Sequence, residues 1–193
     1  MILRFLRFLH FGEKRNYKTE WALTRAVYLL IILFSPLFAD KILIPMDLAQ
    51  TDHLYAYGVA YHALEKGMTV EWLLNYRGGS FMFDPNQALE RECRLKGVFF
   101  ETVPPGRLVE IRKTIEANNM ESVMLEKAPK VAVYVAPNQR PWDDAVRLAL
   151  DYAQIPYDRV WDKEVLAGRL EEYDWIQLHH EDFTGQFGKF FGS

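Results

Sequence analysis

The chain has 193 residues, half of them apolar, which is enough for an α/β domain with a sizeable core. Its formal net charge at pH 7 is −3, and no basic stripe follows the N-terminal region, so the sequence argues against nucleic-acid binding. The single cysteine, Cys93, excludes an intrachain disulfide. Its spacing from Leu89 on one helical face predicts a packing role rather than a reactive thiol.

The first 39 residues resemble a targeting segment. Six basic side chains precede an apolar run over residues 26–39, which is shorter than the roughly 20 residues that a membrane span needs. Residues 1–39 are therefore predicted to be a signal peptide cleaved before Asp40, and the alternative is an uncleaved signal anchor, which would be the only membrane contact. Cleavage removes six of 23 basic and two of 26 acidic residues, and leaves an acidic protein in the periplasm or outside the cell.

From Asp40 onward, apolar strand-like runs alternate with amphipathic helical stretches. For residues 40–129, an N-terminal α/β region, the sequence predicts strands over 41–46, 70–75 and 98–103, and helices over 52–66, from Asp84-Pro85 to Gly97, and over 107–118. The pattern restarts at Lys130, which makes residues 130–193 a candidate second domain. There the sequence predicts strands over 130–136, 157–161 and 175–178, and helices from Asn138 to Pro156 and over 164–170. Strands separated by helices predict an α/β fold with a mostly parallel sheet and helices on both faces.

Polar side chains stand out just past the ends of four of these strands. They are Asp47, then Tyr76, Arg77, Gly78 and Gly79, then Asn138, and finally His179, His180, Glu181 and Asp182. In a parallel sheet these ends would share one edge, which is where open α/β folds bind ligands. The ten residues are therefore the candidate ligand-binding set, although polar loops also follow strands without any function.

Two of these stretches carry recognisable chemistry. Residues 77–80 (Arg-Gly-Gly-Ser) could bring backbone amides and a guanidinium to an anion, with a plain glycine turn as the alternative, and they lack the spacing and Lys of a phosphate loop. Residues 179–182 offer metal-ligand and acid/base atoms, but neighbours in an extended segment point to opposite sides, so at most two could reach one ion. We therefore expect no metal site, and no particular cofactor is indicated.

Three stretches, residues 44–47, 74–81 and 178–186, resemble a bacterial exported family often labelled asparagine synthetase B-like. The resemblance runs over nearly all of residues 40–193 and implies that the chain is the N-terminal part of a longer protein. From Lys130 the order of expected elements is similar to the opening of a class I glutamine amidotransferase-like domain. That resemblance implies a flavodoxin-like sandwich, truncated after its last strand.

Asparagine synthetase activity does not follow from this resemblance. Those enzymes use a cysteine at the mature N-terminus, where cleavage here would leave Asp40, and a Ser-Gly-Gly-x-Asp-Ser loop, whose acidic residue the 77–80 stretch lacks. Amidotransferase-like folds carry their nucleophile after a later strand, so the chain is expected to be catalytically incomplete as it stands.

Two functions remain open at this point. The first is an exported binding or structural module that recognises a small polar or carbohydrate ligand. The second is the N-terminal part of an amidotransferase-like hydrolase whose catalytic residues lie beyond this chain. In either case the expected strand over residues 175–178 has no helix after it to cover it, which predicts self-association through this strand.

Overall fold

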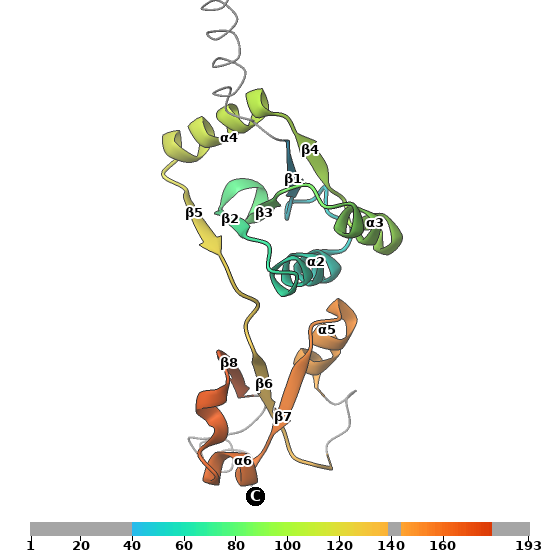
Figure 1. Cartoon of the computed structure of the whole chain (residues 1–193), viewed down its shortest axis with the longest axis vertical. Helices are drawn as coiled ribbons and strands as arrows, with labels where there is room; N and C mark the ends of the chain where they lie inside the picture. The colour runs from blue at the N-terminus through green and yellow to red at the C-terminus, as the bar shows by residue number, and fades with distance from the viewer. Residues whose placement is uncertain (1–39, 139–143, 179–193) are drawn as a thin grey trace, which may run out of the picture. The chain divides into compact units, whose positions relative to one another are not determined.

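The computed structural model describes residues 40–138 and 144–178, which form two β-sheets with helices packed against them (Figure 1). The larger sheet has the strand order β4-β1-β3-β2-β5, and the smaller sheet has the order β7-β6-β8. The elements of the larger sheet and its helices are β1 (Lys41–Ile44), α2 (His53–Glu65), β2 (Val70–Leu74), η2 (Tyr76–Gly78), β3 (Ser80–Phe83), α3 (Gln87–Lys96), β4 (Glu101–Val103), α4 (Pro105–Ala117) and β5 (Glu121–Leu125). Those of the smaller sheet are β6 (Val131–Tyr134), α5 (Ala145–Ala153), β7 (Tyr157–Val160), α6 (Asp162–Leu166), η4 (Arg169–Glu172) and β8 (Trp175–Leu178).

Every strand pair of the larger sheet is antiparallel. The prediction of a mostly parallel, flavodoxin-like sheet is therefore wrong. The antiparallel order has a physical cause in the connection between β2 and β3, which is the short turn around η2 and contains no crossover helix. Parallel neighbours need a long crossover connection, so a turn this short permits only antiparallel pairing. The backbone reverses there through left-handed conformations, with φ values of 64° at Asn75, 46° at Arg77, 81° at Gly78 and 94° at Gly79.

Side chains of the larger sheet alternate between two apolar clusters, as the two-residue period of a strand requires. On one face, Ile42, Ile44 and Phe81 pack with residues of α2 and α3, among them the fully buried Cys93. The other face packs against α4 through a second cluster, which contains Leu43, Leu73, Met82, Ile111 and Ile115. Burial raises the pKa of the Cys93 thiol to about 12, so this cysteine is a packing residue at neutral pH.

Parallel pairing occurs in the smaller sheet, where β6 lies between β7 and β8 and runs in the same direction as both. One face of this sheet is covered by α5, whose Leu150 and Val146 pack on Val131 and Val133 of β6. The helix is capped by Asp144, whose Oδ1 accepts hydrogen bonds from the backbone N–H groups of residues 146 and 147. The predicted opening of this helix at Asn138 is therefore too early.

Other element boundaries differ from the sequence predictions in similar ways. Helix α3 is capped by the side chain of Asn86 rather than by Asp84, and it begins at Gln87. Strands β3 and β5 were not expected at all. Of the described residues, no helix is both long enough and apolar enough to cross a membrane. The division of the chain into a signal peptide and two α/β regions, after residues 39 and 129, stays a prediction.

Helix α2 and helix α5 join the two sheets by direct contact. A Cβ atom added to Gly58 of α2 would lie 2.1 Å from the backbone oxygen of Ala153 in α5, so only glycine permits this approach. Nearby, the Tyr152 hydroxyl donates to Asp52 Oδ2 at 2.5 Å, and His62 Nε2 lies 2.9 Å from the carbonyl oxygen of Gln154.

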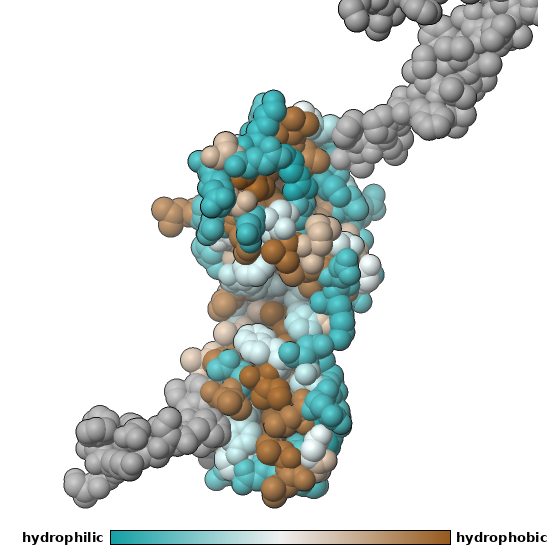
Figure 2. All heavy atoms as spheres, turned by 90° about the vertical axis from the view of Figure 1, so that its left-hand side faces the viewer, coloured by the Kyte–Doolittle hydropathy of each residue, from teal (hydrophilic) through white to brown (hydrophobic). Residues whose placement is uncertain are grey.

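The edge strands leave apolar side chains at the surface. Val123 and Met124 of β5 and Trp175 and Leu178 of β8 are between 38% and 54% exposed. Figure 2 faces the side on which β5 and β8 are drawn in Figure 1, and it shows apolar surface interrupting the hydrophilic surface there. Exposed apolar side chains on β8 are compatible with self-association through this strand, which stays a prediction.

Candidate functional site

The structure brings some of the candidate residues together and separates others. Asp47 and Arg77 are in contact at one edge of the larger sheet, because β1 and β2 are both antiparallel to β3 and so point in the same direction. Asn138 lies elsewhere, beyond the end of β6 in the smaller sheet. The four candidates at residues 179–182 lie outside the described residues.

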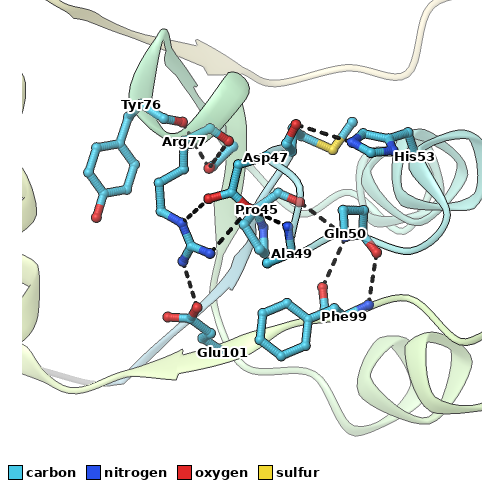
Figure 3. A network of polar contacts seen from close by, with 11 residues as sticks. Pro45, Asp47, Ala49, Gln50, His53, Tyr76, Arg77, Phe99 and Glu101 are labelled. Carbon is cyan, nitrogen blue, oxygen red and sulfur yellow. Dashed lines mark hydrogen bonds and ion pairs between the residues drawn. The ribbon is translucent and has the colours of Figure 1, made fainter.

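The contact between Asp47 and Arg77 is part of a network with Glu101 of β4 (Figure 3). Arg77 Nε donates to Asp47 Oδ2 at 2.6 Å, and Nη2 donates to Asp47 Oδ1 at 3.3 Å. Arg77 Nη1 donates to Glu101 Oε1 at 2.5 Å. One guanidinium therefore joins the turn after β1, the turn around η2 and the strand β4.

The charges in this network stabilise each other. Hydrogen bonds from Arg77 hold the pKa of Asp47 below its ordinary value, and the same bonds raise the pKa of the guanidinium. Asp47 Oδ1 also accepts from the backbone N–H of Ala49 at 3.0 Å. Three of the five guanidinium donors are thus already used, which indicates a network that fastens segments of the chain to each other.

The glycines after Arg77 serve the same packing. A Cβ atom at Gly78 would lie 2.3 Å from the backbone oxygen of Met46, so the two turns approach closely only because residue 78 is glycine. The backbone N–H of Gly79 donates to Tyr76 O at 3.0 Å, and its carbonyl oxygen accepts from Trp72 Nε1 at 3.1 Å. The amide of Gly79 is therefore already engaged, which favours the glycine-turn interpretation over an anion-binding loop.

Sequence reasoning missed two further members of this corner, Gln50 and His53. Gln50 is buried and fully bonded: its Nε2 donates to Pro45 O and Phe99 O, and its Oε1 accepts from Phe99 N at 3.0 Å. His53 Nε2 lies 3.2 Å from Met46 O. Nothing in the sequence distinguishes these residues from other polar loop residues, because their partners are backbone atoms brought close by the fold.

A second polar site lies at the carboxyl ends of the parallel strands β6 and β7. A hollow of about 260 Å³ opens there, and the candidate residue Asn138 is not among its lining residues. Its lining residues are Val135, Pro137, Arg159, Val160, Trp161 and Glu164. This is the end of a parallel sheet at which ligands usually bind.

Three side chains give this hollow its chemistry. Arg159 Nη2 donates to the carbonyl oxygens of Ala136 and Pro137 at 3.1 and 3.2 Å, and its Nε and Nη1 have no hydrogen-bond partner among the described residues. Glu164 Oε2 accepts from the backbone N–H of Trp161 at 3.0 Å, whereas its Oε1 accepts no hydrogen bond from the described part of the chain. The hollow thus presents a donor and an acceptor beside an indole ring.

The indole is held in place by its neighbours. The Trp161 ring stacks on Tyr134 with the ring centroids 4.7 Å apart and the planes 26° apart. The Tyr134 hydroxyl in turn donates to Asp162 Oδ1 at 2.5 Å. These contacts restrict the rotamers of the aromatic pair, and a rigid aromatic wall loses little conformational entropy when a ligand binds.

Another hollow, of about 500 Å³, lies between α2, α5 and β8. Its lining is almost wholly apolar and consists of Leu54, Tyr57, Ala145, Val146, Ala149, Leu150, Ala153, Ile155 and Trp175. Ligand sites combine apolar walls with a few polar groups that fix orientation. The lining of this larger hollow offers almost no polar groups to orient a ligand, so the hollow is a weaker candidate site for a polar ligand.

Across residues 40–138 and 144–178, no group of three or more His, Cys, Asp or Glu side chains is arranged to hold a metal ion.

Comparison with known proteins identifies no relative: no family model matches the chain, and neither do any curated protein sequences or solved structures. The resemblance to the asparagine synthetase B-like family and to amidotransferase-like domains therefore stays a prediction.

Proposed function

We propose that this chain is an exported binding module that holds a small polar ligand, of the size of a monosaccharide, at the carboxyl ends of β6 and β7. The observation that carries the proposal is the hollow of about 260 Å³ beside Arg159, Trp161 and Glu164. Its volume lies just below the usual range of ligand pockets, which begins at about 300 Å³, and this favours a small ligand.

The chemistry of the lining favours a hydroxylated ring. Arg159 supplies N–H donors and Glu164 supplies a carboxylate acceptor, while the Trp161 ring supplies an apolar surface between polar groups. Sugar hydroxyl groups both donate and accept hydrogen bonds, and the carbon–hydrogen faces of a sugar ring are apolar. Charge-assisted bonds to a guanidinium and a carboxylate are stronger than neutral ones, so two such bonds would orient the ring.

The corner around Asp47 and Arg77 is a poorer site for the same ligand. Its guanidinium already binds two carboxylates, and Gln50 is saturated by backbone groups. A ligand would have to displace bonds that fasten β1, β2 and β4 to each other. We therefore assign this corner to the stability of the fold.

Export is proposed from the N-terminal sequence. Basic residues followed by a short apolar run are typical of a signal peptide, and removal of this segment would leave an acidic mature chain. Binding of a sugar by an exported protein needs no metal, nucleotide or thiol.

The test is a binding measurement on the purified chain with glucose, galactose, N-acetylglucosamine and glucuronate as probes. We expect at least one of them to bind with a Kd on the order of 1 mM, about −4 kcal/mol. Arg159→Met should weaken that binding at least tenfold, because it removes the donors. The matched control is Arg169→Met, which removes another exposed arginine that pairs with Glu172 and does not line the hollow. Equal loss in both variants, or no binding of any probe, would contradict the proposal.

A further inference from the structure

Strand β5 forms an edge of the larger sheet that is open to solvent in the described part of the chain. It pairs with β2 on one side over five consecutive residue pairs, from Val70 with Leu125 to Leu74 with Glu121. No described strand pairs with its other side. Its first four residues are exposed, including Val123 and Met124.

The sequence of β5 has few of the usual protections of such an edge. Proteins blunt edge strands with charged side chains, especially lysine, and with proline, β-bulges or very short length. The stretch Glu-Ser-Val-Met-Leu contains neither proline nor lysine, its one charged residue is at its first position, and its unbroken register with β2 leaves no bulge. An edge of this kind is competent to accept another strand.

We propose that β5 pairs antiparallel with β5 of a second copy of this chain, about a two-fold axis at Met124. The two five-stranded sheets then become one continuous sheet. This pairing sets Met124 against the partner's Met124 and Val123 against the partner's Leu125. If the pairing continues two residues past the end of β5 at Leu125, it also sets Ser122 against the partner's Glu126, and Glu121 against the partner's Lys127.

Charge complementarity selects both the occupant and the register. About the axis at Met124, Glu121 faces the partner's Lys127, and the apolar residues 123 to 125 face each other. Moving the axis by one residue to Val123 would set Glu121 against the partner's Leu125 and Glu126 against the partner's Met120. Both carboxylates would then lie opposite apolar side chains.

Lys127 is available for the contact across the axis. It is largely exposed, and its Nζ already donates to both carboxylate oxygens of Asp174 at 2.8 and 2.9 Å. An ammonium group has three donors, so Lys127 can bind Asp174 and the partner's Glu121 together. The proposal is independent of the sugar site, because β5 does not line that hollow.

Cysteine cross-linking of the full chain tests the register. In the proposed dimer the two residues at position 124 lie directly opposite, with their Cα atoms about 5 Å apart, which fits a disulfide. Met124→Cys should therefore cross-link the dimer under mild oxidation. Glu126→Cys is the matched control, because the two copies of residue 126 would lie about four residues, roughly 13 Å, apart along the strands. Equal cross-linking of both variants would overturn the register, as would no cross-linking of Met124→Cys.

Sedimentation of the full chain tests the interface itself. We expect a dimer whose Kd rises at least tenfold in Met124→Lys, with an unchanged circular dichroism spectrum. Glu121→Lys should also weaken the dimer, because it sets two ammonium groups, at position 121 and at the partner's Lys127, against each other. A monomer at all concentrations would overturn the proposal. A dimer that Met124→Lys leaves intact would do the same, because association would then run through another surface, such as β8.

Discussion

Glu71 of β2 and Arg112 of α4 form a two-pronged ion pair that attaches the helix to the larger sheet. Arg112 Nη1 donates to Glu71 Oε1, and Nη2 donates to Oε2 at 2.6 Å. The Ser122 hydroxyl donates to Oε1 as well. Burial raises the pKa of Glu71, but the bonds from Arg112 and Ser122 outweigh this effect, and the pKa lies below its ordinary value.

Arg112→Met should destabilise the protein by about 2 kcal/mol at pH 7, because it leaves a buried carboxylate without its counter-charge. The loss should be smaller than for a fully buried ion pair, because the Arg112 side chain is partly exposed. The double variant Glu71→Gln with Arg112→Met should recover part of the loss. Urea unfolding measures these free energies, and a double variant less stable than Arg112→Met would contradict this account.

The pH dependence of this pair should change sign in Arg112→Met. In the wild type, the pKa of Glu71 is lower in the folded protein than in the unfolded chain. The ionised carboxylate therefore stabilises the fold at pH values above the pKa of the unfolded chain, and this stabilisation is lost as the pH falls. Without Arg112, burial favours the protonated form of Glu71, so the stability that this group contributes is lost as the pH rises. Arg112→Met should therefore lower the free energy of unfolding less at pH 4 than at pH 7. An equal loss at both pH values would contradict this prediction.

Gly58→Ala should separate α2 from α5. A Cβ atom at Gly58 would lie 2.1 Å from a backbone oxygen, and neither helix backbone can yield without losing hydrogen bonds, so we expect a loss of at least about 2 kcal/mol. Gly106→Ala is the matched control, since Gly106 lies in α4 with open space around its Cβ position. That substitution should be neutral or stabilising by up to about 1 kcal/mol. Similar thermal shifts for both variants would argue against the close contact.

Asp47→Asn should flatten the loss of stability on acidification. Because the pKa of Asp47 is lowered in the folded protein, its ion pair with Arg77 stabilises the fold at pH values above the pKa of this carboxyl in the unfolded chain. This stabilisation is lost as the pH falls. Asparagine cannot ionise, so the variant lacks this titration while it keeps an oxygen for the N–H of Ala49. Stability measured between pH 3 and pH 6 should therefore rise less steeply in Asp47→Asn than in the wild type, and parallel curves would contradict the prediction.

The contact between Asp47 and Arg77 shows how far the sequence could predict the site. Both were expected at one edge of a parallel sheet, and they do lie together, although the sheet is antiparallel. They meet because β1 and β2 flank β3 and run in the same direction. The glycine pair at 78 and 79, followed after Ser80 by the apolar residues 81–83, was a hairpin signal that could have revealed β3.

Other features had no comparable signal. The exposed strand β5 has no two-residue alternation of apolar and polar side chains, because neither of its faces is well covered. The role of Gln50 depends on backbone atoms of residues 45 and 99, which only the fold brings near it. Parallel pairing was predicted well for β6, β7 and β8, where helices connect the strands.

Mass spectrometry of the exported protein tests the signal-peptide prediction. We expect the mature N-terminus at Asp40 or close to it, since the apolar run ends at residue 39. A chain that retains residues 1–39 in the membrane fraction would favour the signal anchor instead.

The most direct test of sugar binding at the smaller sheet is a nuclear magnetic resonance titration that follows the indole N–H signals of Trp161, Trp72 and Trp175. A Trp161→Phe variant assigns the signal of the hollow, and the four monosaccharides serve as probes. We predict that at least one sugar shifts the Trp161 signal and leaves the Trp72 signal, beside the Arg77 turn, unchanged. A shift confined to Trp72 or Trp175, or no shift with any sugar, would contradict binding at the carboxyl ends of β6 and β7.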